Sequence, residues 1–153
     1  MKLPDGRLIE GYLRLEMLDY VVMVALADAG VIILRSYKHG PARVVTSLPA
    51  GYLEPDEDPG DAARRELLEE TGHVAEEWEE LGTFVVDGNR GAGTVHMFLA
   101  RRAREIASPD PGDLEETEMS FVALDDLVAA VGNGEVSVLP MAAAVVLAFA
   151  RDR

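Results

Sequence analysis

Apolar residues in this chain occur mainly in short β-branched runs separated by turn-forming residues, a pattern typical of strands. The run from Val21 to Ala27 predicts a buried strand, and Asp28-Ala29-Gly30 predicts a turn into a second strand over Val31–Arg35. The same reasoning predicts strands over Trp78–Val86, Thr94–Arg101 and Phe121–Ala123, a flexible loop over 87–93, a short helix over Asp125–Val131 and a last helix that begins at Pro140. The chain is therefore expected to mix helices and strands.

One segment, residues 51–72, carries clear helix boundaries. Asp58 is a good N-cap, Pro59 fits the first helical position, where no N–H is needed, and Gly72 is placed to end the helix. These signals predict a helix from Pro59 to Thr71. On this helix Ala63 and Leu67 are expected to face the interior, while the opposite side is expected to hold Ala62, Glu66, Glu69 and Glu70.

Three carboxylates of this helix, those of Glu66, Glu69 and Glu70, share one face because residues three and four apart are neighbours on a helix. Their repulsion costs roughly 0.2–0.5 kcal/mol per like-charged pair. A hard divalent cation such as Mg²⁺ would turn that cost into binding energy, and Mg²⁺ sites are often completed by substrate phosphates. The spacing indicates metal-assisted chemistry on a phosphorylated substrate.

An ordinary solvated acidic face is the alternative interpretation of the same glutamates, since Asp and Glu supply 28 of the 153 residues. The surrounding residues favour the first interpretation. Reading from Gly51, the chain has five residues, Glu57, seven residues, Arg65-Glu66, Leu67, one residue, Glu69-Glu70, one residue and Gly72. This series closely resembles the signature of the Nudix hydrolases. His73 stands where the signature has an apolar residue, and Val74 is expected to take over the buried role.

The order of predicted elements resembles the Nudix fold over essentially the whole chain. The resemblance implies an α+β protein, namely an α/β/α sandwich with a mixed β-sheet, a loop–helix–loop for the signature (the box) and a short N-terminal β-hairpin. It also implies attack of water on a diphosphate bridge, assisted by Mg²⁺ or Mn²⁺.

By the same resemblance the metal ligands are Glu66, Glu69, Glu70 and the carbonyl of Ala50. Gly51 permits the tight backbone bend that turns this carbonyl toward the metal. The box-structural residues are Gly51, Glu57, Arg65 and Gly72, and Arg65 is expected to pair with Glu57 rather than touch substrate.

The general base has two candidate positions. Some Nudix enzymes use a box glutamate that corresponds to Glu66, whereas the ADP-ribose pyrophosphatase branch uses a glutamate from a late loop. In this chain that loop holds Glu115, Glu116 and Glu118, among which Glu116 is favoured. The alternative for all three is an acidic, solvent-exposed turn.

Substrate contacts are expected from a short basic stretch that resembles the phosphate-contacting segment of the same branch. Lys38 stands near the family's arginine, with Arg35 and Arg43 as further candidates. ADP-ribose or another nucleotide sugar is the favoured substrate, although Ser47 stands where that branch often has a glutamate. The competing hypothesis is a Nudix-fold module that binds a nucleotide without turning it over; an acidic interaction domain would explain the charge but not the spacing.

Composition limits the partners. The formal net charge of −14 argues against a nucleic-acid partner, because nucleic-acid binding depends on clustered Lys and Arg. No apolar stretch approaches the ~20 residues of a membrane span, and the N-terminus lacks a signal-peptide pattern. The absence of cysteine fits a cytoplasmic protein.

Two parts of the chain are expected to have separate roles. Residues 1–18 resemble the N-terminal hairpin of the ADP-ribose pyrophosphatase branch, with a preceding strand missing, and residues 19–153 form the Nudix domain. In that branch the N-terminal strands pair across a dimer and contribute to the substrate pocket. The resemblance therefore implies a homodimer.

Overall fold

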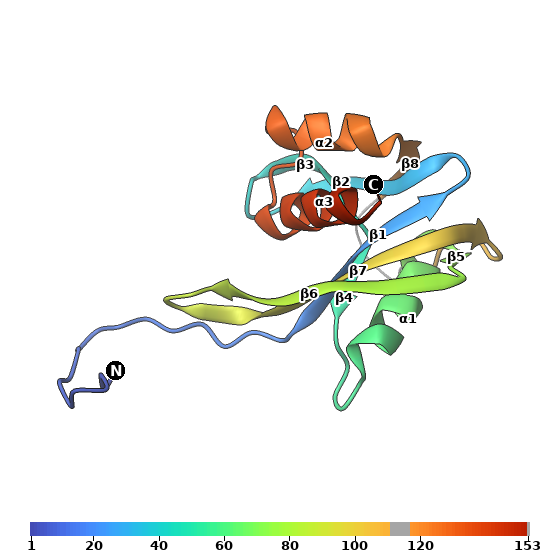
Figure 1. The fold of residues 1–153 in the computed structure, drawn as a ribbon. Coiled ribbons are helices and arrows are strands. Elements are labelled where there is room, and N and C mark those ends of the chain that lie inside the picture. Colours follow the sequence, from blue (N-terminus) through green and yellow to red (C-terminus); the bar gives the residue numbers. More distant parts are fainter. Residues whose placement is uncertain (111–116, 153) are drawn as a thin grey trace.

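The computed structural model describes residues 1–110 and 117–152, and within these ranges it contains eight strands and three helices around one mixed sheet (Figure 1). In chain order the elements are β1 (Tyr20–Ala27), β2 (Gly30–Lys38), β3 (Arg43–Ser47), β4 (Ala50–Tyr52), α1 (Pro59–Thr71), β5 (His73–Val74), β6 (Glu77–Asp87), β7 (Gly91–Glu105), β8 (Glu118–Val122), α2 (Leu124–Gly132) and α3 (Leu139–Arg151).

Strand β1 organises the sheet. Along one edge it runs parallel to β7, with Tyr20 opposite Val95. On its other edge it pairs with two different strands, because β2 joins it only at the β1–β2 turn and β4 joins it at the opposite end. β3 and β8 extend the sheet from β2, and β6 pairs with β7. The split edge of β1 brings the short strand β4, which opens the box, into the centre of the fold.

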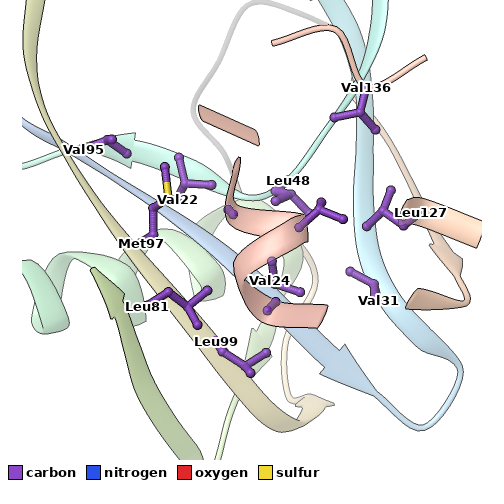
Figure 2. Packing of buried hydrophobic residues seen from close by; sticks show 13 residues of the cluster. Val22, Val24, Val31, Leu48, Leu81, Val95, Met97, Leu99, Leu127 and Val136 are labelled. Carbon is purple, nitrogen blue, oxygen red and sulfur yellow. The ribbon is translucent and has the colours of Figure 1, made fainter. Parts of the chain in front are cut away.

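The side chains of β1 alternate between two hydrophobic cores. Val22 and Val24 pack with residues of α2 and α3, and Val21 and Met23 pack with residues of α1. Figure 2 shows the first core, in which valines of β1 meet Leu99 of β7 and other apolar side chains. Helices therefore cover both faces of the sheet, with α1 on one side and α2 and α3 on the other (Figure 1), and the predicted α/β/α sandwich with a mixed sheet is confirmed.

Most predicted elements match the structure, and the box helix has the predicted bounds Pro59–Thr71. The flexible loop predicted over 87–93 is wrong: strands β6 and β7 pair as far as Asp87 and Gly91 and leave only a tight turn between them. Three short strands, β3, β4 and β5, had no sequence prediction. Their few residues give no periodicity, and pairing with β2, β1 and β7 defines them.

The N-terminal segment lies apart from the sheet sandwich (Figure 1). At its Pro4–Gly6 turn the N–H of Leu3 donates to the carbonyl of Arg7 and the N–H of Gly6 donates to the carbonyl of Leu3, and an isolated bridge joins Lys2 and Leu8. Further on, Leu15 forms a parallel bridge with Gly91 at the tip of the β6–β7 hairpin. The assignment of residues 1–18 as a separate unit remains a prediction.

In the described part of the chain, every helix is too short or too polar to cross a membrane.

Candidate active site

The box has the helix caps that its sequence predicts. The carboxylate of Asp58 accepts a hydrogen bond of 2.8 Å from the backbone N–H of Gly60, and Pro59 opens the helix. At the other end Gly72 adopts a left-handed conformation, with φ of 71°, and donates to the carbonyl of Leu68. A Cβ at Gly72 would lie 2.0 Å from the carbonyl oxygen of Ala107, so only glycine fits there.

Arg65 connects the loop and the helix of the box. Its Nε and Nη2 donate to the two oxygens of the Glu57 carboxylate, each at 2.9 Å, in a bidentate pair. Its Nη1 donates to Glu66 at 2.7 Å and to Glu69 at 3.0 Å. Nη2 also donates to the backbone carbonyl of Tyr52 at 3.1 Å. One guanidinium therefore joins three carboxylates and the end of β4, and the predicted pairing of Arg65 with Glu57 is present.

Glu57 is held in its charged form. The hydrogen bonds from Arg65, together with one from the backbone N–H of Glu54 at 2.8 Å, lower its pKa to about 2. The same contact with Glu57 raises the pKa of Arg65 above its usual range. Glu57 is 15% exposed, and its hydrogen bonds connect Glu54, in the loop before α1, to Arg65 on the helix.

Glu66 is the most enclosed of these carboxylates, with 13% of its side chain exposed. Burial raises its pKa, while the adjacent Arg65 opposes that rise. The carboxylate lies directly against Gly51, where an added Cβ would stand 1.9 Å from Glu66 Cδ and 2.0 Å from Oε1. Gly51 therefore allows the Glu66 carboxylate to approach the β4 backbone closely.

Glu70 approaches the same backbone from α1. Its Oε2 accepts a hydrogen bond of 2.8 Å from the N–H of Ala50. Glu66 and Glu70 thus lie beside two successive residues of β4, Gly51 and Ala50, and Glu69 is nearer solvent, with 48% of its side chain exposed. The structure thus places Glu66 and Glu70 beside β4 and joins Glu66 to Glu69 through Arg65. Ala50 contacts Glu70 through its N–H, and its carbonyl stays a predicted ligand.

The donor chemistry of this cluster fits a hard divalent cation, since three carboxylates on one face of the helix supply oxygen ligands of the type that Mg²⁺ and Mn²⁺ prefer. Within residues 1–110 and 117–152 no three acidic or histidine side chains already converge around a single point. In this arrangement Arg65 supplies the neutralising positive charge to Glu66 and Glu69.

Two predictions about the faces of the box are wrong. Ala62 does not lie on the glutamate side: it is fully buried with Ala63 and Leu67, because it packs into the core that α1 forms with β1 and β7. His73, not Val74, is the buried residue after the helix, with 3% exposed. Its Nδ1 makes a 2.7 Å hydrogen bond with the carbonyl of Thr71, so burial leaves that ring nitrogen satisfied.

The predicted phosphate-contacting residues lie on the β2–β3 hairpin rather than on the box. Lys38 and Arg43 are register partners on either side of the turn that connects the two strands. Arg35 and Arg43 line one cavity of about 330 Å³, together with Thr46 and Glu135, and Arg35 forms an exposed 3.7 Å ion pair with Glu118. Glu118 begins β8, whereas Glu115 and Glu116 lie outside the described residues.

Sequence reasoning missed an aromatic pair beside the box. Tyr20 and Tyr52 are directly opposite each other on β1 and β4, with ring centroids 6.1 Å apart and planes at 70°. Burial, and then the charge of Tyr52, raises the pKa of Tyr20. The only hint of this pair in the sequence is that Tyr52 directly follows Gly51 of the box. The hint identifies Tyr20 as its partner only when the pairing of β4 with β1 is known.

Comparison with known proteins gives a consistent picture. A family model described as NUDIX domain matches residues 17–141. Among curated proteins, the ADP-ribose pyrophosphatase of Bacillus subtilis is 31% identical over 118 residues, which are 76% of this chain and 64% of that protein. The ADP-ribose pyrophosphatase of Mycobacterium tuberculosis is 31% identical over 123 residues, covering 79% of this chain and 58% of that protein.

A mouse ADP-sugar pyrophosphatase is 30% identical over 103 residues, 64% of this chain and 47% of that protein. The chain therefore spans about half to two thirds of the length of these relatives. A solved structure described as an ADP compounds hydrolase superposes with a TM-score of 0.68 at 21% identity, over 84% of this chain and 69% of that one, which supports the fold.

Replacing Gly51 with alanine is expected to displace the Glu66 carboxylate without unfolding the protein, because the atoms that a Cβ would meet are the mobile end of a side chain. The pKa of Glu66, raised by burial in the wild type, should move back toward its ordinary value. Titration of side-chain carboxyl signals by NMR measures this shift. Gly132→Ala, where a Cβ meets nothing within 4 Å, is the control; an unchanged Glu66 pKa in Gly51→Ala would contradict the assignment.

Replacing Glu57 with glutamine is expected to lower stability at neutral pH, because Arg65 loses its bidentate partner. Since the folded-state pKa of Glu57 is lowered from 4.5 to about 2, the stabilisation by its charge is complete above pH 4.5 and is lost as pH falls toward 2. The difference in unfolding free energy between wild type and variant should therefore narrow across that range, as measured by urea unfolding at several pH values. A difference that stays constant below pH 4.5 would be inconsistent with this ion pair.

Proposed function

The chain belongs to the Nudix family, and on that premise we propose that it is a divalent-metal-dependent hydrolase of a diphosphate linkage in a nucleoside diphosphate derivative. The observation that carries the proposal is the box cluster, in which Glu66 and Glu70 lie against β4 and Arg65 holds Glu66 and Glu69. A protein that had only to fold would gain nothing from placing three mutually repelling carboxylates on one face of a helix.

ADP-ribose, or another nucleotide sugar, is the substrate that we propose. Support comes from the names of the relatives, of which two are ADP-ribose pyrophosphatases and one is an ADP-sugar pyrophosphatase. Water would attack one phosphorus of the diphosphate bridge, the bond from that phosphorus to the bridging oxygen would break, and two phosphate monoesters would leave. For ADP-ribose these products are AMP and ribose 5-phosphate. Nucleotide substrates of this kind would place the protein in the cytoplasm.

Within the site, Glu66, Glu69 and Glu70 would hold the metal, with the carbonyl of Ala50 as the fourth proposed ligand. A bound Mg²⁺ or Mn²⁺ ion supplies charge neutralisation for the phosphates and lowers the pKa of water. Arg65 and Glu57 keep the carboxylates in place, because their bidentate pair fixes the loop to the helix.

Activation of the attacking water needs a base, for which we propose Glu116 or, alternatively, Glu66. Among the described residues Glu66 is the candidate, because its carboxylate lies against β4 next to the other box glutamates. Lys38, Arg35 and Arg43 are proposed to contact the phosphates. The positive charge of these side chains supports this role, and two of them, Arg35 and Arg43, line the same cavity.

The alternative function is a module that binds a nucleotide without hydrolysing it. Such a module would keep ligand affinity when its box carboxylates are neutralised one at a time, whereas an enzyme would lose turnover. The turnover measurement on Glu70→Gln described below therefore distinguishes the enzyme from the binding module.

A homodimer is the assembly that we propose, with residues 1–18 at the interface. In this segment several large apolar side chains are exposed, which is costly for a lone chain: Leu8 at 75%, Leu13 at 65%, Leu18 at 64% and Met17 at 50%. The segment also contacts the tip of the β6–β7 hairpin, since the hydroxyl of Tyr12 donates to the carbonyl of Asn89 in the turn there.

Glu70→Gln is expected to reduce turnover at least about 100-fold, because it removes one metal-binding charge while it retains the shape of the side chain. The protein should remain folded, since the amide oxygen can still accept the hydrogen bond from Ala50. Phosphate-linked turnover with Mg²⁺ or Mn²⁺ measures this across ADP-ribose, nucleotide sugars, dinucleoside polyphosphates, NADH and nucleoside triphosphates. A chelator should stop the wild-type reaction, and added Mg²⁺ should restore it.

The control for this experiment is Asp61→Asn, which removes a charge from the exposed first turn of the same helix. Its turnover should equal that of the wild type. Full activity of Glu70→Gln would reject the ligand assignment, and wild-type silence with detectable nucleotide binding would favour the binding module.

Deletion of residues 1–18 is expected to convert the dimer to a monomer, because it removes the exposed apolar side chains of that segment. Light scattering coupled to size-exclusion chromatography gives the mass of each species; the full chain should approach twice 16.6 kDa. A monomeric full chain, or a truncated chain that remains dimeric, would contradict the proposed interface.

A further inference from the structure

The Tyr20–Tyr52 pair lies on the opposite side of β4 from Glu66. Tyr52 follows Gly51 on this strand, and successive residues of a strand point to opposite faces. Gly51 faces Glu66 on α1, so Tyr52 faces the α3 side, where Tyr20 packs against the first hydrophobic core. The aromatic pair and the carboxylate cluster are therefore separated by one strand of backbone.

A cavity opens at this pair. It has a volume of about 170 Å³ and is lined by Tyr20, Ala50, Gly51, Tyr52 and Met141, the last from the start of α3. This volume is below the roughly 300–1,000 Å³ of pockets that enclose a whole ligand, so it suits one part of a larger molecule. Ala50 and Gly51, which contact Glu70 and Glu66, form its wall nearest the box.

The backbone of Tyr52 is tied into the network of the box. Its carbonyl accepts the 3.1 Å hydrogen bond from Arg65 Nη2, and Arg65 in turn holds Glu57, Glu66 and Glu69. Tyr52 is nevertheless 51% exposed, while Tyr20, opposite it, is half-buried. An aromatic ring that packs against a second ring, is open on one side and lies one strand away from the box carboxylates is suited to stacking on a ligand.

A cross-strand aromatic pair that serves only the sheet is the simpler explanation of Tyr20 and Tyr52, because such pairs are common between antiparallel strands. That explanation accounts for the ring contact. It does not account for the open cavity between the rings and Met141. A pair that only stabilised the sheet would be most stabilising if neighbouring side chains filled this space.

We propose that Tyr52, backed by Tyr20 and Met141, is the subsite that stacks on the nucleobase of the substrate. The inference rests on the proposed function and deepens it, because it places the base on the α3 side of β4 while the diphosphate lies at the box. The lining consists of aromatic rings, a thioether and backbone, with few polar atoms. Such a lining matches the flat face of a base, whereas the hydroxyls of a sugar would lose their water without gaining partners.

The test compares two products of the proposed reaction, one with a base and one without. Tyr52→Ala and Tyr52→Leu should raise the KM for ADP-ribose and the inhibition constant of AMP by about 5-fold to 100-fold, the range expected for loss of one base–aromatic stack. The inhibition constant of ribose 5-phosphate and the kcat should change by less than about 2-fold. Tyr52→Phe, which keeps the ring, should behave as the wild type. A general loss of structure would affect both products, so the split between them isolates stacking.

Phe121→Ala is the matched control, since Phe121 is also an exposed strand aromatic, at 40%, in an edge contact with His73 at 6.0 Å. It should leave both inhibition constants unchanged. If the wild type hydrolyses ADP-ribose and the Tyr52 variants bind AMP as tightly as it does, the subsite is wrong and the proposed function stands. If the wild type hydrolyses nothing, calorimetric titration with AMP still tests the subsite. Weaker binding of AMP by Tyr52→Leu than by the wild type supports it. Equal binding of AMP by the two proteins, or no binding by the wild type, overturns it.

Discussion

The charge balance around Arg65 is the interaction on which the rest of the site depends. Three glutamates of the box helix carry a cost that the fold must offset: Glu66 is largely enclosed, with 13% of its side chain exposed, and Glu69 and Glu70 stand beside it on the same helix. The guanidinium reduces this cost by contacting Glu57, Glu66 and Glu69 at once. Its five donors in a planar fork make this possible, and a lysine ammonium would lack the bidentate geometry.

The sheet supplies the second constraint, which is position. Because β2 leaves the edge of β1 after a short pairing, β4 can occupy the remaining edge and run between α1 and α3. Its three residues then have distinct tasks: Ala50 donates to Glu70, Gly51 admits Glu66, and Tyr52 accepts from Arg65 while its ring points to the other side. A strand too short to be recognised by pattern thus connects the two faces of the fold at the site.

The sequence was enough to predict features that depend on neighbouring residues of the chain. The caps of α1 at Asp58 and Gly72, the shared face of the glutamates and the pairing of Arg65 with Glu57 all follow from spacing and side-chain chemistry. Prediction from the sequence failed for features that depend on tertiary contacts. Ala62 is buried because it packs into the core that α1 forms with β1 and β7, and His73 is buried because Thr71 offers its carbonyl. The Tyr20–Tyr52 pair required knowledge that β4 pairs with β1.

The central claim is that the box glutamates, kept close together by Arg65, form a divalent-cation site. Calorimetric titration of Mn²⁺ into the wild type and into Glu66→Gln tests this without reliance on any substrate. The account predicts saturable binding to the wild type and a loss of affinity of at least about tenfold in the variant, since a hard cation depends on charged oxygen ligands. Equal binding by both proteins, or none by the wild type, would contradict it.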